Sequence, residues 1–216
     1  MLLYQYFEHV HAISAIWTRD LKISTLDNLN DPFEMTPRMV MEGVDLPLSE
    51  CKKWIVDRFN VKYGMICLSP KLSDPVLWAH YAAKHTGMAL GFDVSADDPD
   101  LIDVDYDDER VRLSVDADRC EQRVCFEKLI RTKFSSWGYE DEYRYLVQKA
   151  QCVERNGLFF YYPFFRDRFR KVVLGFRCPI TANDMRCTLD RAGYQDVGIS
   201  QVRPNKVTFE MTPRDI

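Results

Sequence analysis

The residues best suited to chemistry lie between positions 137 and 147, where three carboxylates and a guanidinium stand among four large aromatic rings. In an extended chain, side chains alternate between two faces, which would place Glu140, Glu142 and Arg144 together on one face. In a helix, Glu140 and Arg144 would instead form an i,i+4 ion pair worth about 0.2–0.5 kcal/mol. The aromatic and aliphatic residues that follow favour a strand from Glu142 onward. Two interpretations stay open: a charged site anchored by an aromatic face, or a salt-bridged, half-buried strand.

Other polar and aromatic side chains could join such a site. They are Tyr4, Tyr6, Asn30, Asp31, Glu34, Ser69, Trp78, His80 and Tyr81. Asp31 stands before Pro32 and Glu34 follows, which is also typical of a capped helix or turn, so a structural role and a site role stay open for both acids. The sequence contains no P-loop, GxGxxG, HExxH or GxSxG motif, and its cysteines and histidines do not define a nucleophile and base.

Composition places the chain among ordinary globular proteins. With 216 residues, of which 46% are hydrophobic and 29% charged, it can form one sizeable core. The net charge of -4 argues against a broad nucleic-acid footprint, although a local basic groove stays open. Seven scattered cysteines fit reduced thiols in the cytoplasm better than a disulfide framework. We expect no membrane span and no signal peptide, because no apolar run approaches about 20 residues and the first residues lack a basic region.

Helical and extended patterns alternate along the chain. They predict a single α+β domain over residues 1–216, with a mixed, mostly antiparallel sheet and amphipathic helices packed on it. Strands are expected at 2–7, 21–26, 61–68, 88–93, 102–106, 157–165, 171–176, 199–202 and 207–211, and helices at 8–18, 49–59, 73–87, 118–134 and 181–193. The acidic segment 97–109 lacks the ligand spacing of a calcium loop and is expected to be a solvated loop around the strand 102–106.

Apolar spacing also predicts which helix faces turn toward the core. The expected inward residues are Val10, Ile13 and Trp17 in 8–18; Cys51, Trp54, Ile55 and Phe59 in 49–59; Leu77, Trp78, Tyr81 and Ala82 in 73–87; and Cys120, Val124 and Leu129 in 118–134.

Several short motifs occur in an order that resembles a known bacterial family. They are Tyr-x-Tyr at 4–6, Asn-Asp-Pro-Phe-Glu at 30–34, Cys-Leu-Ser at 67–69, Leu-Trp-Ala-His-Tyr-Ala at 77–82, His-x-Gly at 85–87, Val-x-Tyr at 104–106, Lys133, Trp-x-Tyr-Glu-x-Glu-Tyr-Arg at 137–144 and Val-Leu-Gly at 173–175. Over residues 2–176 the chain resembles a family of unknown function that is related to the abortive phage-resistance protein AbiGi. The resemblance implies a bacterial cytosolic protein, often encoded near phage-defence genes, and it assigns no reaction.

The first functional hypothesis is an enzyme that transfers ADP-ribose from NAD or hydrolyses NAD. Such chemistry needs a carboxylate that holds a ribose hydroxyl and stabilises an oxocarbenium-like centre beside aromatic walls. The Glu-x-Glu arrangement is similar to that of ADP-ribosyltransferases, which implies Glu142 as the catalytic carboxylate and Glu140 as the group that polarises an acceptor. Arg144 and His80 would then hold phosphate. Tyr4 and Tyr6 depart from the His or Arg that such enzymes commonly carry there.

The remaining expectations of that hypothesis concern its binding residues and a variant. Tyr4, Tyr6, Asn30, Asp31, Ser69, Trp78, Tyr81 and Arg144 would line the substrate site, with NAD as substrate and no metal ion. Glu142→Ala is expected to abolish activity while leaving the thermal midpoint within a few degrees.

Two alternatives stay open. One is a metal-dependent nuclease that uses Asp31, Glu34, His80 and the Glu-x-Glu pair. The other is a non-enzymatic antitoxin or sensor, which binds a small ligand or a partner protein encoded nearby and keeps these groups as a buried polar network. An enzyme predicts that Tyr4, Ser69, His80, Glu142 and Arg144 line one open cleft. A binding module predicts that the same five side chains are closed off and mutually satisfied.

Overall fold

A computed structural model describes residues 1–216, except for the side chain of Asp27. The α-helices are α1 (His9–Thr18), α2 (Leu48–Phe59), α3 (Pro75–Tyr81), α4 (Arg119–Leu129), α5 (Tyr162–Arg168) and α6 (Ala182–Ala192), and the 3-10 helices are η1 (Leu26–Asn28), η2 (Ser135–Glu140) and η3 (Lys149–Gln151). The strands are β1 (Leu2–Phe7), β2 (Leu21–Lys22), β3 (Arg38–Met41), β4 (Val44–Asp45), β5 (Tyr63–Leu68), β6 (Met88–Asp93), β7 (Leu101–Asp103), β8 (Asp105–Asp107), β9 (Arg112–Ser114), β10 (Thr132–Phe134), β11 (Tyr143–Gln148), β12 (Val153–Arg155), β13 (Leu158–Tyr161), β14 (Phe169–Leu174), β15 (Gly198–Pro204) and β16 (Met211–Asp215).

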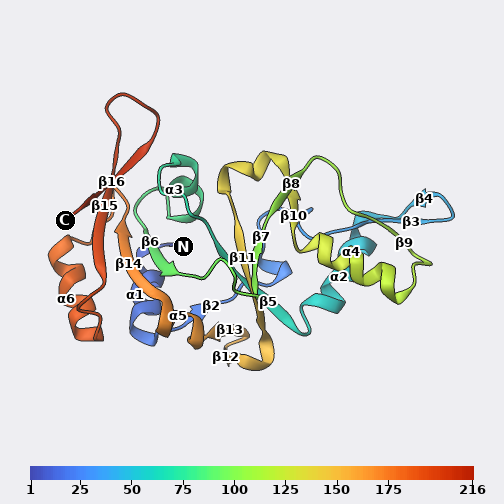
Figure 1. Cartoon of the computed structure of the whole chain (residues 1–216), viewed down its shortest axis with the longest axis horizontal. Helices are drawn as coiled ribbons and strands as arrows, with labels where there is room; N and C mark the ends of the chain where they lie inside the picture. Colours follow the sequence, from blue (N-terminus) through green and yellow to red (C-terminus); the bar gives the residue numbers. More distant parts are fainter.

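The expected α+β class is confirmed, but the strands form several sheets rather than one. The largest sheet has five strands in the order β1-β6-β14-β15-β16, and three-stranded sheets include β5-β11-β7 and β4-β3-β9. Most pairings are antiparallel, and β14 with β15 is one of the parallel ones. Figure 1 shows the five-stranded sheet at one end, β5-β11-β7 in the middle, and α2, α4 and the β3-β4 hairpin at the other end.

The two main sheets meet where β1 passes the end of β5. Tyr4 and Ser69 exchange backbone hydrogen bonds of 2.8 and 2.9 Å across this junction. One hydrophobic cluster joins the five-stranded sheet to α1, α5 and α6, and a second lies between α2, α4 and β5. The polar residues described below lie at the junction, between these clusters.

Local signals predicted several elements well. Asp74 caps α3 by accepting a hydrogen bond of 2.7 Å from the backbone N–H of Val76, and Pro75 occupies the first turn. The strand at 88–93 is β6, which is central and buried on both faces as its unbroken apolar run predicts. Helix α2 buries Cys51, Ile55 and Phe59 as expected, with Trp54 half-buried.

The predicted inward faces of two helices are only partly confirmed: Ile13 of α1 packs against the core and Leu129 of α4 is buried, whereas the other predicted residues are exposed. In α1, Val10 and Trp17 are about half exposed, and the buried residues are Ala12, Ala15 and Ile16. This helix packs on β6 and α6, and small side chains allow the close approach. In α4, Cys120 and Val124 are exposed, and the buried residues are Cys125 and Leu129.

Other predicted elements end early or change type. The strand predicted at 21–26 stops at Lys22 and is followed by η1, and the helix predicted at 118–134 ends at Leu129 and is followed by strand β10. The strand predicted at 102–106 is divided between β7 and β8. The strand-like run 157–165 becomes helix α5 at Tyr162, where Pro163 suits a first helical turn. Residues 207–210 form the tip of the β15-β16 hairpin, with Val207 and Phe209 almost fully exposed, and the strand β16 begins only at Met211. Within the part of the chain that the structure describes, no helix is long and apolar enough to cross a membrane.

Candidate functional site

The charged stretch around Glu140 folds differently from a continuous strand. Helix η2 ends at Glu140, Asp141 adopts a left-handed backbone with φ 51°, and β11 begins at Tyr143. This turn sends the half-exposed Asp141 outward and directs Glu140 and Glu142 inward, where both are buried. The predicted strand is therefore confirmed only for the segment after Glu142. The shared face nevertheless exists, because Glu140, Glu142 and Arg144 contact one buried lysine or its partners.

Lys133 of β10 is that lysine, and its ammonium joins three carboxylates. Its Nζ lies 2.5 Å from Glu140 Oε2, 2.9 Å from Glu142 Oε2 and 3.8 Å from Glu34 Oε1. The Lys133 side chain is only 3% exposed. A buried ammonium requires such partners, because an unpaired charge in the interior would be very costly.

Arg144 forms the second cationic centre of the same cluster. Its Nε donates to Glu142 Oε1 at 3.2 Å, its Nη1 donates to the backbone carbonyl of Ile130 at 3.0 Å, and its Nη2 pairs with Glu34 Oε1. The guanidinium has no exposed surface. Arg144 therefore holds Glu34, Glu142 and the backbone at Ile130 in place. Because its guanidinium is buried, it is separated from any phosphate group of a ligand.

The buried cluster formally holds one more carboxylate than cations. Burial raises the pKa of Glu34 to about 7, since attraction from Arg144 and Lys133 offsets the loss of hydration only in part. Burial would also raise the pKa of Glu142, but Arg144 and Lys133 outweigh it and hold that pKa at about 2. At neutral pH, Glu142 is thus an anion, and Glu34 is divided between its protonated and ionised forms.

A cavity of about 250 Å³ opens beside this cluster. Its wall is made by Tyr4, Gln5, Tyr6, Ser24, Asn28, Leu29, Asn30, Glu34, Cys67, Leu68, Ser69, Leu77, Tyr81, Lys133, Glu140 and Glu142. It lies at the junction of the two main sheets, and its wall combines aromatic rings from β1 and α3 with the carboxylates of the ion cluster. We call it the first cavity.

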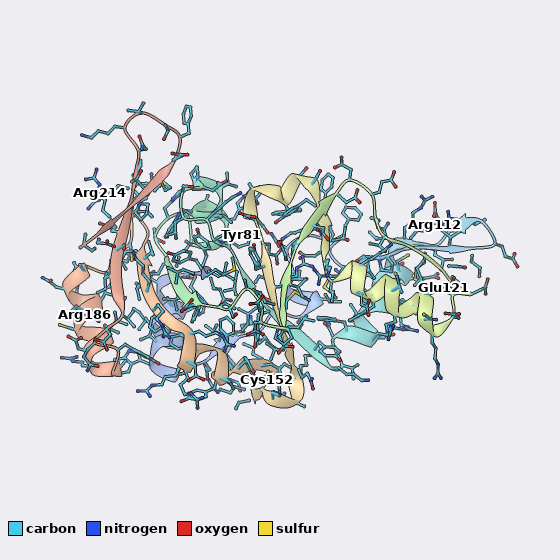
Figure 2. The ribbon with its side chains drawn as sticks, in the orientation of Figure 1. Tyr81, Arg112, Glu121, Cys152, Arg186 and Arg214 are labelled. Carbon is cyan, nitrogen blue, oxygen red and sulfur yellow. The ribbon has the colours of Figure 1, made fainter. Side chains whose placement is uncertain are left out.

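Hydrogen bonds tie the walls of the first cavity to Glu140. The hydroxyl of Tyr81 (Figure 2) donates to Glu140 Oε1, and Asn30 Nδ2 donates to the same hydroxyl at 2.8 Å. Ser69 Oγ donates to the backbone carbonyl of Glu140 at 2.5 Å. Burial, reinforced by the negative charge of Glu140, raises the pKa of Tyr81, so its hydroxyl stays protonated and acts as a donor.

Besides the enclosed Arg144, three expected site residues lie apart from the first cavity. His80 is outside its wall, and its Nδ1 is 3.0 Å from the hydroxyl of Tyr139. Trp78 is fully buried, donates to the backbone carbonyl of Leu72 at 2.8 Å and packs edge-on against Tyr6. Asp31 accepts a hydrogen bond of 2.9 Å from the backbone N–H of Phe33 and lines a second cavity.

The enzyme hypothesis predicts an open cleft and the binding-module hypothesis predicts an enclosed network, and the expected residues differ in which description they fit. Tyr4, Ser69 and Glu142 line the first cavity, but all three are buried, and Glu142 and Arg144 are paired inside the protein. Of the residues expected to hold a metal ion in a nuclease, Glu34, Glu140 and Glu142 surround the ammonium of Lys133, whereas Asp31 and His80 lie outside the first cavity. Among the described residues, no group of three or more His, Cys, Asp or Glu side chains is arranged to hold a metal ion.

Sequence reasoning gave no site role to Lys133 and left that of Glu34 open. Lys133 carries a weak signal, a lysine between Thr132 and Phe134 where the chain was expected to be helical. Its burial and its ion pairs with Glu140 and Glu142 show that the side chain turns inward from β10. Comparison of the chain with protein-family models, with curated proteins and with solved structures found no match in any of the three.

Proposed function

We propose that the first cavity is the active site of an enzyme that acts on NAD, by ADP-ribosyl transfer or by hydrolysis. The observation that carries this proposal is the convergence of Glu140 and Glu142 on a cavity walled by Tyr4, Tyr6 and Tyr81. The nicotinamide ring of NAD is cationic, and positive charge moves to the ribose as the ring leaves. Fixed carboxylates stabilise that developing charge without reorganising during the reaction.

The two carboxylates would have different tasks. Glu142 is held as an anion by Lys133 and Arg144, so it supplies a permanent negative charge below the ribose. Glu140 shares its carboxylate with Tyr81 and Lys133, and we assign to it the direct contact with the ribose hydroxyls. This assignment reverses the roles that the resemblance to ADP-ribosyltransferases implies.

The size of the first cavity limits how NAD would bind. Typical ligand pockets measure about 300–1,000 Å³, and the first cavity measures about 250 Å³. It would therefore enclose the nicotinamide and its ribose, while the rest of the dinucleotide lies along the surface. Lys71 contacts Tyr6, a residue of the cavity wall, through its backbone carbonyl, and both Lys71 and His80 contact Tyr139. We assign to these two side chains the contact with the phosphates of NAD.

A non-enzymatic sensor or antitoxin remains the second candidate, in the phage-defence setting that the resemblance implies. The observation that favours it is the enclosure of Arg144, each of whose three nitrogens donates a hydrogen bond inside the protein. Such a module would bind a partner protein and would keep the ion cluster to specify the fold.

Nicotinamide release from NAD tests the proposal. The purified chain is compared with Glu140→Gln, which keeps the shape of the side chain, and with Glu127→Gln, the same change at an exposed position on α4. We expect release by the wild type and by Glu127→Gln, and a loss of about 10²-fold or more in Glu140→Gln. Absence of release by the wild type, with and without bacterial lysate as a source of acceptors, would refute the enzyme and favour the binding module.

A further inference from the structure

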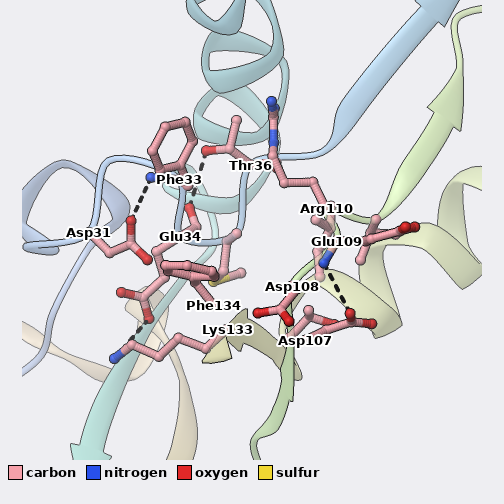
Figure 3. Close-up of a pocket in the computed structure, with 14 residues that line it drawn as sticks. Asp31, Phe33, Glu34, Thr36, Asp107, Asp108, Glu109, Arg110, Lys133 and Phe134 are labelled. Carbon is pink, nitrogen blue, oxygen red and sulfur yellow. Dashed lines mark hydrogen bonds and ion pairs between the residues drawn. The ribbon is translucent and has the colours of Figure 1, made fainter. Parts of the chain in front are cut away.

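A second cavity, of about 260 Å³, lies beside the ion cluster. Its wall is made by Asp31, Phe33, Glu34, Met35 and Thr36 from one loop, by the segment 107–111 after β8, and by Leu129, Thr132, Lys133 and Phe134 (Figure 3). Glu34 and Lys133 belong to the walls of both cavities. These two side chains therefore stand between the two cavities and face both.

Glu34 has one oxygen without a protein partner. Its Oε1 pairs with Arg144 and lies 3.8 Å from Lys133, whereas its Oε2 is buried and accepts no hydrogen bond from any described residue. The side chain is 1% exposed. A buried polar atom without a partner is costly, so native proteins rarely keep one unless a ligand, a proton or a water molecule meets it.

The backbone beside Glu34 is also held in an uncommon conformation. Met35 has a positive φ of 52° although it is a buried, non-glycine residue. Such left-handed positions are unfavourable for residues other than glycine, and they cluster at functional sites. Here the turn places Glu34 against Lys133 and Arg144.

We propose that the second cavity admits a protic nucleophile to the reaction centre, and that Glu34 accepts its proton. The nucleophile is water, or the hydroxyl or amine of an acceptor molecule. This inference rests on the proposed function of the first cavity. It makes Glu34 a catalytic residue. From the sequence, a structural role in a turn and a role in the site had both stayed open for Glu34.

The step balances with NAD as the only other reactant. The oxygen or nitrogen of the nucleophile forms a bond to C1′ of the ribose, and the bond from C1′ to the nicotinamide nitrogen breaks. The electron pair of the broken bond leaves with nicotinamide, which becomes neutral. The proton of the nucleophile passes to Glu34 Oε2 and is later released to solvent. Water as nucleophile gives ADP-ribose, and a larger acceptor gives the ADP-ribosylated product.

Glu34 suits this task better than its neighbours. The charged and titratable groups that face it are Lys133 from β10, Glu140 from η2, Glu142 and Arg144 at the start of β11, and Cys67 from β5. A general base works best with a pKa near the operating pH, and the pKa of Glu34 is about 7. Glu142, with a pKa of about 2, is too weak a base, and burial raises the pKa of the Cys67 thiol.

The first arm of the test follows nicotinamide release between pH 5.5 and 9. The wild-type rate should rise with pH through about 7 and then level, because Glu34 must be ionised to accept a proton. Glu34→Gln should lose that inflection and about 10²-fold or more of the rate, while KM for NAD stays within about threefold. Glu34→Asp, which keeps a base, should recover part of the rate, and Glu127→Gln should behave as the wild type.

The second arm narrows the second cavity without changing a charge. Val111→Phe adds bulk to its wall, and Val115→Phe makes the same change at an exposed position. Val111→Phe should lower the rate of NAD turnover, with water or with a larger acceptor, while NAD affinity measured by calorimetry is retained. This arm leaves the ion cluster intact, so it tests the role of the second cavity even if Glu34→Gln does not fold.

The outcomes separate the two proposals. An unchanged rate and pH profile in Glu34→Gln, or unchanged turnover in a folded Val111→Phe, would overturn the inference and leave the NAD-consuming function standing. A wild type that releases no nicotinamide would overturn both.

Discussion

Truncating Glu142 should destabilise the protein strongly, because this side chain holds two buried cations. Glu142 Oε2 lies 2.9 Å from Lys133 Nζ, and Oε1 lies 3.2 Å from Arg144 Nε. Removing one partner of a buried ion pair costs about 3–5 kcal/mol, because the other charge stays buried. At about 2–4 °C per kcal/mol for a chain of this size, Glu142→Ala should lower the thermal midpoint by about 6–20 °C. The sequence alone predicts nearly no change.

Calorimetry and urea unfolding at neutral pH measure this loss. Glu127→Ala serves as the control, since that exposed side chain should change the free energy of unfolding by no more than about 0.5 kcal/mol. The double variant Lys133→Met with Glu142→Leu removes a cation together with its partner, and its loss should fall short of the summed single losses by about 0.5–3 kcal/mol. A loss below about 1 kcal/mol in Glu142→Ala would refute the buried ion cluster as a source of stability.

Two further predictions concern the core and the pH dependence of stability. Trp78→Ala should cost about 3–5 kcal/mol in urea unfolding, because the ring is fully buried and its indole N–H is bonded; near-native stability would contradict that placement. Glu34 binds its proton more tightly in the folded state, with a pKa of about 7 against an ordinary value of 4.5, so its contribution to stability is present at low pH and is lost as the pH rises from about 4.5 to 7. Relative to Glu34→Gln, the wild type should lose on the order of 3 kcal/mol across that window, and parallel stability curves for the two proteins would argue against the raised pKa.

The parts of the fold that sequence predicted are those with strong local signals. Asp74 with Pro75 caps a helix through contacts within one turn. The unbroken apolar run of β6 indicates a buried strand, whatever its neighbours are. The inward face of α1 depended instead on its neighbours. A single helix cannot show that Ala12 and Ala15 meet a close partner while Trp17 does not.

Only part of the candidate site could be predicted from the sequence, for a related reason. Glu140, Glu142 and Arg144 are close in sequence, so their common position could be inferred from alternation alone. Glu34 and Lys133 come from segments about 100 residues apart, and nothing local shows that they face the same carboxylates. The turn at Asp141 was missed because a left-handed aspartate has no distinctive sequence pattern.

The order of strands in the five-stranded sheet has a consequence for synthesis on the ribosome. β1 and β6 are adjacent and are complete by residue 93, but β14, which covers the other edge of β6, ends only at Leu174. At about 5–20 residues per second, the nascent chain carries β6 with one open edge for roughly 4–16 seconds. During that time the apolar strand could pair with another chain. Folding yield at high expression should therefore depend on chaperones that bind nascent chains, and slower translation between β6 and β14 should lengthen the interval of risk.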